Sequence, residues 1–139
     1  MKKSLQGGYL CGRVRFTLNG PPLRANHCHC RMCQLAAGAP FVTWAVVRQS
    51  DLTWPLDEPK LFPSSDVAER GFCPGCGSAL TFRYLTEKNE IDLAAVCFDD
   101  PRAIEPIDHI WTKTRPDWIK LADGLPEHEG KRGGNSTER

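Results

Sequence analysis

Cys73-Pro74-Gly75-Cys76-Gly77 is the stretch of this chain that constrains its structure most strongly. Two cysteines three positions apart on a tight turn can hold one metal ion through both sulfurs, and the glycines let backbone amides approach those sulfurs. The competing interpretation is a redox-active dithiol, which in thioredoxin-like proteins requires a strand–helix–strand setting that this sequence lacks. The stretch therefore predicts a zinc knuckle.

A second cluster, Cys28-His29-Cys30-Arg31-Met32-Cys33, lies earlier in the chain. On an extended backbone Cys28 and Cys30 point to the same face, and the following turn can bring Cys33 next to them. Three sulfurs can fill three of the four tetrahedral positions of zinc and leave the last open, which is typical of a catalytic site.

Spacing alone leaves two arrangements open. In the first, two cysteines of the 28–33 cluster complete a closed four-thiolate site with Cys73 and Cys76. In the second, Cys11, which precedes a predicted strand, joins the knuckle and leaves the 28–33 cluster for a separate ion. The position of Cys11 favours two sites.

Three histidines accompany these clusters. His27 and His29 flank Cys28, and packing or surface exposure is more typical of such residues than metal ligation. His109, two residues before Trp111, is a candidate for a pocket residue or for orienting a ligand.

Composition limits the number of domains and the classes of protein to which this chain can belong. The chain has 139 residues, of which 40% are hydrophobic and 25% charged, as expected for one globular domain. No apolar stretch is long enough to span a membrane, and a net charge of +1 argues against nucleic-acid binding. Seven cysteines without an apolar signal segment in residues 1–10 favour free thiols in a reducing compartment, so we expect a cytoplasmic protein.

Short apolar segments bounded by turn residues predict an all-β domain over residues 1–126. We expect residues 13–18 and 23–28 to form strands that could pair, and one short helix over 31–37 that ends at Gly38. Further strands are expected at 41–47, 61–62, 67–72, 79–85 and 91–98. A loop-rich wrap follows Pro101, and residues 127–139, which have no apolar side chain, are expected to form a mobile polar tail.

These motifs, taken in order, resemble the family of glutathione-dependent formaldehyde-activating enzymes, which includes centromere protein V. The resemblance covers most of the chain. It is carried by Gly7 to Gly12, Cys28 to Cys33, Gly38 to Phe41, Arg70 to Ser78, Asp99 to Pro101 and His109 to Trp111.

The resemblance implies a β-tent fold of stacked antiparallel sheets with two zinc sites. Cys11, Cys73 and Cys76 would be structural ligands, whereas Cys28, Cys30 and Cys33 would hold the catalytic ion, with Cys30 as the catalytic residue. The family usually starts with a Cys-x-Cys-Gly element, but Tyr9 stands at the first of these positions. Water, Cys97 and His27 are candidates for the missing ligand.

The expected function is therefore that of a zinc-dependent carbon–sulfur lyase. By analogy with the family, its partners would be a small thiol such as glutathione and a small aldehyde such as formaldehyde. The alternative is a non-catalytic zinc-ribbon-like module that binds another macromolecule, although a three-cysteine cluster is more than such a module needs.

Overall fold

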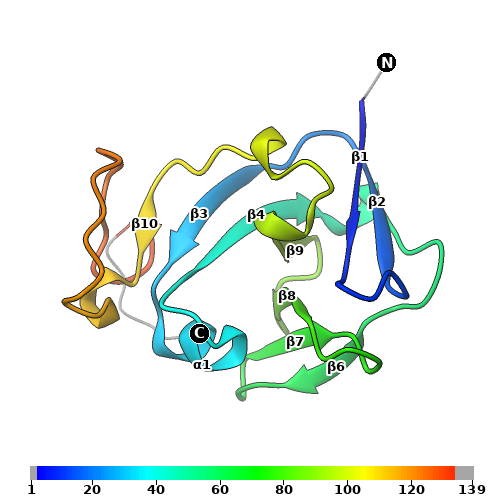
Figure 1. Ribbon diagram of the computed structural model, residues 1–139, viewed down its shortest axis with the longest axis horizontal. Helices are drawn as coiled ribbons and strands as arrows, with labels where there is room; N and C mark the ends of the chain where they lie inside the picture. The colour runs from blue at the N-terminus through cyan, green and yellow to red at the C-terminus, as the bar shows by residue number, and fades with distance from the viewer. Residues whose placement is uncertain (1–2, 134–139) are drawn as a thin grey trace.

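The computed structural model describes residues 3–133, which form two β-sheets and one short α-helix (Figure 1). The smaller sheet has the strand order β1-β2-β5, and its pairs are antiparallel. Its strands are β1 (Ser4–Gly8), β2 (Arg15–Asn19) and β5 (Leu52–Thr53). The predicted all-β class is confirmed.

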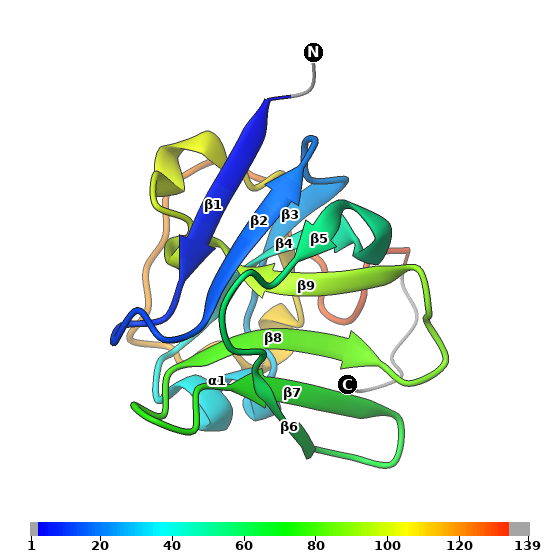
Figure 2. The ribbon, with the colours of Figure 1, turned by 90° about the vertical axis from the view of Figure 1, so that its right-hand side faces the viewer.

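The larger sheet has the strand order β10-β3-β4-β9-β8-β7-β6 and is antiparallel except where β10 meets β3. Figure 2 shows β6, β7, β8 and β9 running side by side across it. The strands of this sheet are β3 (Arg24–Cys28), β4 (Val42–Arg48), β6 (Lys60–Pro63), β7 (Ala68–Phe72), β8 (Ala79–Tyr84), β9 (Glu90–Ala94) and β10 (His109–Ile110).

The expected pairing of the first two predicted strands is wrong. β2 pairs with β1 and β5, whereas β3 pairs with β4 and β10, so the turn after Asn19 carries the chain from one sheet to the other. Pro21 and Pro22 lack amide donors and cannot continue a hairpin ladder there.

β1 was not predicted, because two of its five residues are glycines, which disfavour strands. Its position explains Gly7. A Cβ on this residue would collide with the Cys97 carbonyl oxygen and the Phe16 ring. The glycine therefore lets β1 approach the chain that follows β9.

The last long strand is shorter than expected. β9 ends at Ala94, and residues Ala95–Cys97 form a 3-10 turn. The Phe16 ring packs edge-on against Phe98 beyond this turn, with 5.0 Å between ring centroids. This contact joins the small sheet to the core, which also contains the fully buried side chains of Phe82 and Leu93.

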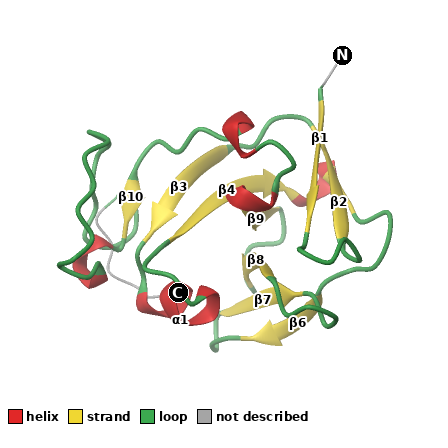
Figure 3. Ribbon diagram, viewed as in Figure 1, coloured by secondary structure: helices red, strands yellow, loops and turns green. Residues whose placement is uncertain are grey.

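The only α-helix among residues 3–133 is α1 (Arg31–Ala37), and it has the predicted limits. Figure 3 colours it red together with the short 3-10 turns. Cys30 caps its N-terminus, because the Cys30 sulfur accepts a hydrogen bond from the Cys33 amide. Gly38 ends it in the left-handed conformation, with φ of 62°. No helix in the described part of the chain is long and apolar enough to cross a membrane.

Part of the segment expected to be a mobile polar tail makes contacts with β10 and its neighbours. The His128 amide donates to the His109 carbonyl at 2.9 Å, and the Trp111 amide donates to Gly130 at 2.9 Å. Arg132 also pairs with the buried Asp108 carboxylate at 2.6 Å. These contacts use backbone and charged groups, so the lack of apolar side chains did not predict them. Residues 134–139 lie outside the described residues.

Candidate metal centres and the adjoining cavity

Cys28, Cys30 and Cys33 come together at the junction of β3 and α1. Cys28 ends β3, Cys30 caps α1 and Cys33 lies in its first turn. Their sulfurs lie within 4.8 Å of one another, and those of Cys33 and Cys28 are 3.6 Å apart. The predicted convergence of three sulfurs from one short segment is therefore confirmed.

The geometry of this group fits zinc. Four sulfurs placed tetrahedrally at the usual zinc–sulfur distance of about 2.3 Å are about 3.8 Å apart, close to the separation found here. Cys28 and Cys33 are fully buried, whereas Cys30 keeps 7% of its surface exposed. The pKa of the Cys30 thiol is raised, because the Cys33 sulfur and burial together outweigh the lowering effect of the Cys28 hydrogen bond. A divalent cation would offset this penalty on the thiolate form.

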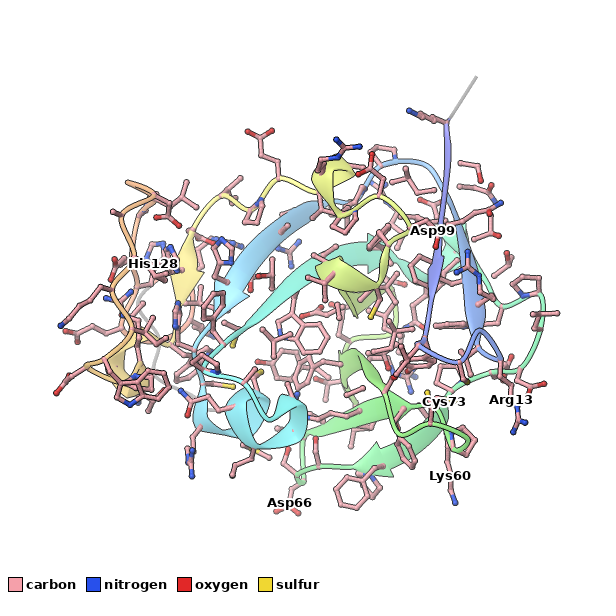
Figure 4. The ribbon with its side chains drawn as sticks, in the orientation of Figure 1. Arg13, Lys60, Asp66, Cys73, Asp99 and His128 are labelled. Atoms are coloured by element: carbon pink, nitrogen blue, oxygen red, sulfur yellow. The ribbon has the colours of Figure 1, made fainter. Side chains whose placement is uncertain are left out.

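Cys11, Cys73 and Cys76 form a separate group. Cys73 and Cys76 lie in the loop between β7 and β8, and Cys11 comes from the loop after β1, with its sulfur 3.6 Å from that of Cys73. Figure 4 shows Cys73 near the loop that follows β1, on the same side of the molecule as Arg13. The arrangement in which both clusters share one closed four-thiolate site is therefore wrong.

Backbone hydrogen bonds close the knuckle loop, and Ser78 contacts one of its sulfurs. The Cys73 amide donates to the Ser78 carbonyl, and the Gly77 amide returns to the Cys73 carbonyl. The Ser78 hydroxyl lies 3.2 Å from the Cys76 sulfur. This hydroxyl, with the Ser78 backbone, lowers the pKa of Cys76 to about 6. At neutral pH Cys76 is thus largely in the form that binds metals.

Tyr9 lies against this second group without a hydrogen-bond partner. Its side chain is buried, and its hydroxyl is unpaired among the described residues. Burial, followed by the nearby thiols of Cys97, Cys73 and Cys76, raises the pKa of Tyr9 above its usual range. Of the protein candidates for the missing ligand, neither Cys97 nor His27 belongs to this group in the described part of the chain.

A chain of hydrogen bonds leads from the partly exposed Asp123 to the buried His29, which stands between Cys28 and Cys30 in sequence. Asp123 Oδ2 lies 2.8 Å from His109 Nε2, and His109 Nδ1 lies 2.9 Å from His29 Nε2. His29 and His109 are fully buried, and His27 stacks on His109 with 4.7 Å between ring centroids. Burial, and then the neighbouring His109 and Arg115, lower the pKa of His29 to about 4, so it is neutral at pH 7.

The same segment is fixed through its backbone. The His29 carbonyl accepts hydrogen bonds from the Thr114 hydroxyl at 2.7 Å and from the Gln34 side-chain amide at 3.1 Å. His29 is therefore held by Gln34, His109 and Thr114. This arrangement agrees with the expectation that His29 packs rather than ligates a metal ion.

A cavity of about 400 Å³ lies between α1, β6 and β7, and none of Cys28, Cys30 and Cys33 belongs to its described lining. Its lining is mostly apolar and includes Met32 and Leu35 of α1 and Phe62 of β6. Arg70 of β7 also lines the cavity, and its Nη2 lies 3.6 Å from the Cys33 sulfur. A volume of this size is sufficient for a small ligand.

Two residues of this region were not singled out from the sequence. Arg70 was assigned no role from the sequence beyond its place in the family motif, because strand alternation does not show that a charged side chain is buried. Asp123 lies 14 residues beyond His109 in an irregular segment, so no local pattern links them. The one available signal was Arg70 itself, a cation in a short strand that ends directly before the knuckle.

Comparisons with known proteins bear on the family and on the fold of this chain. The family model for glutathione-dependent formaldehyde-activating enzymes matches residues 4–114. A Schizosaccharomyces pombe protein named as an uncharacterized lyase is 25% identical over 118 residues, which is 85% of each chain. A crystal structure of a Rhodobacter sphaeroides protein has 22% identity and a TM-score of 0.57, covering 70% of this chain and 92% of that one. The last comparison concerns the fold alone.

Proposed function

Since this chain belongs to the family of glutathione-dependent formaldehyde-activating enzymes, we propose that it is a zinc-dependent carbon–sulfur lyase acting on an adduct of a small thiol and a small aldehyde. In the direction of synthesis the thiol sulfur forms a bond to the aldehyde carbon, and the thiol proton ends on the former carbonyl oxygen. The lyase direction breaks the same carbon–sulfur bond and returns that proton to sulfur.

The observation that carries this proposal is the convergence of Cys28, Cys30 and Cys33 beside the cavity, apart from the knuckle cysteines. Both cysteine groups offer three sulfurs and leave one tetrahedral position open, but the first is the one whose sulfur contacts the charged residue of the cavity lining, Arg70. Zinc held by these three cysteines would supply Lewis acidity and would favour the anionic form of a thiol. Cys30 is proposed as the catalytic residue, because it is the one member of the group with exposed surface.

The surrounding residues keep this group in place. The Cys30 sulfur accepts the Cys33 amide hydrogen at 3.3 Å, and Arg70 donates to the Cys33 sulfur. Hydrogen bonds to sulfur reduce its electron donation, which counteracts the weakening of Lewis acidity by three thiolates. Cys11, Cys73 and Cys76 would hold a second, structural zinc, and Tyr9 leaves that site one cysteine short. These free thiols require a reducing compartment, so we also propose a cytoplasmic location.

Cys30→Ser tests the catalytic assignment. Serine is a good helix N-cap, so the variant retains an acceptor for the Cys33 amide and should keep the fold. We expect the rate of adduct formation and breakdown, measured by NMR exchange with formaldehyde and a thiol, to fall to the uncatalysed background. The matched control is Cys97→Ser, which removes a cysteine outside both groups and should keep the wild-type rate.

Metal content separates the enzyme from a non-catalytic zinc module. We expect two zinc ions per wild-type chain, and one ion in Cys30→Ser with an unchanged circular dichroism spectrum. Full turnover in Cys30→Ser would refute the catalytic role of this residue. One ion in the wild type, with no rate above background, would favour the binding module instead.

A further inference from the structure

Arg70 is a buried cation without a carboxylate partner. Only 8% of the residue is exposed, and none of the ion pairs among the described residues includes it. Its Nη2 donates to the Cys33 sulfur, and its guanidinium lies 4.9 Å from the centre of the Phe82 ring. Its Nε has no hydrogen-bond partner. Burying a charge is costly unless an anion compensates it, and the cysteine group with zinc bound, at a net charge of −1, would supply one such anion through Cys33. The cavity lined by Arg70 gives room for a second.

The place where an anion can reach Arg70 is the cavity beside the first cysteine group. Arg70 is the only charged residue of its lining, and the remainder is mainly apolar, with Met32, Leu35, Phe62 and Phe72 contributing the larger side chains. A guanidinium among apolar walls suits a ligand that has a single anionic group on a compact apolar body.

We propose that this cavity selects the thiol substrate, and that it takes a short mercaptocarboxylate whose carboxylate is bound by Arg70. The inference rests on the proposed function, which supplies the thiol. Because Arg70 contacts the Cys33 sulfur, a carboxylate bound at Arg70 places a thiol two or three carbons away beside the cysteine group.

The same lining disfavours glutathione as the preferred thiol. Glutathione has two carboxylates and an ammonium group, whereas the cavity contains one cation and no carboxylate. The ammonium and the second carboxylate would lose water without gaining a partner of opposite charge. The specificity of this chain would therefore differ from the one that its family name describes.

Binding without any aldehyde tests this inference separately from turnover. The probes are 3-mercaptopropionate, its methyl ester, glutathione and butyrate, which has a carboxylate but no thiol. By calorimetry on the zinc-loaded protein, we expect 3-mercaptopropionate to bind at least tenfold more tightly than its ester or glutathione. Butyrate should bind weakly and compete with it. Equal affinities for the acid and its ester would overturn the inference.

Arg70→Met and Arg70→Lys identify the residue responsible. Methionine removes the charge but retains much of the volume, so the preference for the acid over the ester should fall to about one. Arg70→Lys retains a positive charge, so it should keep part of the preference for the acid that Arg70→Met loses. If Arg70 only balances the charge of the cysteine group, Arg70→Met will change zinc retention but leave the acid-to-ester ratio as in the wild type, and the inference fails.

A second pair of variants avoids the buried position. Leu35 lines the cavity but is 66% exposed on α1, so charged replacements there should leave the fold intact. Leu35→Glu should weaken binding of 3-mercaptopropionate severalfold, and Leu35→Lys should strengthen it, with little change for the ester. Identical affinities in both variants would also contradict the inference. Selective binding without turnover would instead refute the proposed function and leave the substrate-binding role of Arg70 standing.

Discussion

At the residue scale, His29 shows how the site depends on one uncharged side chain. It is fully buried between two candidate ligands, and it exchanges a hydrogen bond with His109. A protonated imidazole would be placed close to His109 and Arg115, both of which disfavour a positive charge. Burial and these neighbours therefore favour the neutral form of His29 in the folded protein.

This preference makes stability depend on pH. The pKa of His29 is about 4 in the folded state, because of burial first and the nearby positive groups second, and about 6.5 in an unfolded chain. Between these values the unfolded chain binds the additional proton, so stability decreases as the pH falls from about 6.5 to 4. At about 1.4 kcal/mol for each pKa unit, this group should account for a loss of about 3 kcal/mol.

Urea unfolding with saturating zinc at several pH values, compared between wild type and His29→Asn, measures this contribution. The difference in unfolding free energy between the two proteins should shrink as the pH falls through this window. A constant difference from pH 7 to 4 would show that His29 does not resist protonation. Titration of the His29 ring by NMR gives an independent value.

Tyr9 determines how many protein ligands the Cys11, Cys73 and Cys76 group can offer a metal ion. A neutral phenol with a high pKa is a poor metal ligand, so the Cys11, Cys73 and Cys76 group has three sulfur donors. Tyr9→Cys should add a fourth thiolate and slow the transfer of zinc to a chelator. Tyr9→Phe is the control: it removes only the hydroxyl, and it should leave zinc retention unchanged. Faster zinc loss from Tyr9→Phe would instead identify the hydroxyl as a ligand.

At the element scale, α1 is defined by signals that are visible in the sequence. Its N-cap is itself a candidate metal ligand, and Gly38 at its end is the type of residue that a left-handed C-cap requires. Gly38 is the signal that predicted where α1 ends, and the cysteine spacing predicted the convergence of the three sulfurs around its first turn. The capping role of Cys30 is seen only in the structure.

Strand pairing could not be predicted from local sequence signals. β2 and β3 are adjacent in sequence, and their alternating residues fit a hairpin, yet they belong to different sheets. Which strands pair depends on long-range packing, such as the contact of Phe16 with Phe98, and no local pattern encodes it. The roles of Arg70 and Asp123 were missed for the same reason, since their partners are 37 and 14 residues away.

The C-cap of α1 allows a direct test of how local signals support the site. Gly38 has φ of 62°, and a Cβ at this position would meet no other atom within 4 Å, so its substitution changes backbone strain without steric overlap. Gly38→Ala should destabilise the protein by about 1 kcal/mol, and Gly38→Asn by less, because asparagine tolerates this conformation. Thermal unfolding checks both variants. An alanine variant as stable as the wild type would show that α1 does not depend on this cap.

At the scale of the whole molecule, the two cysteine groups differ in what they join. Cys28 and Cys33 are five residues apart, so an ion held there closes a very short loop within one junction of the large sheet. Cys11 and Cys73 are 62 residues apart and come from loops of different sheets. An ion held by Cys11, Cys73 and Cys76 would therefore cross-link the small sheet to the large one.

Loop closure gives this difference a magnitude. If the metal link is treated as a cross-link, closing a 62-residue loop stabilises the folded state by about 4 kcal/mol, and closing a 5-residue loop by about 2 kcal/mol. Loss of the ion held by Cys11, Cys73 and Cys76 should therefore loosen the small sheet from the large one, whereas loss of the other ion should leave every strand pair in place.

Cys76→Ser and Cys33→Ser are the matched pair that tests this. We expect Cys76→Ser to lower the melting temperature much more than Cys33→Ser, although each variant should lose one zinc ion. Hydrogen exchange should accelerate in β1 and β2 of Cys76→Ser, because these strands depend on the cross-link, and remain slow there in Cys33→Ser. Equal melting temperatures, or faster exchange of β1 in both variants, would mean that the two ions do not divide into one that holds the sheets together and one that is available for chemistry.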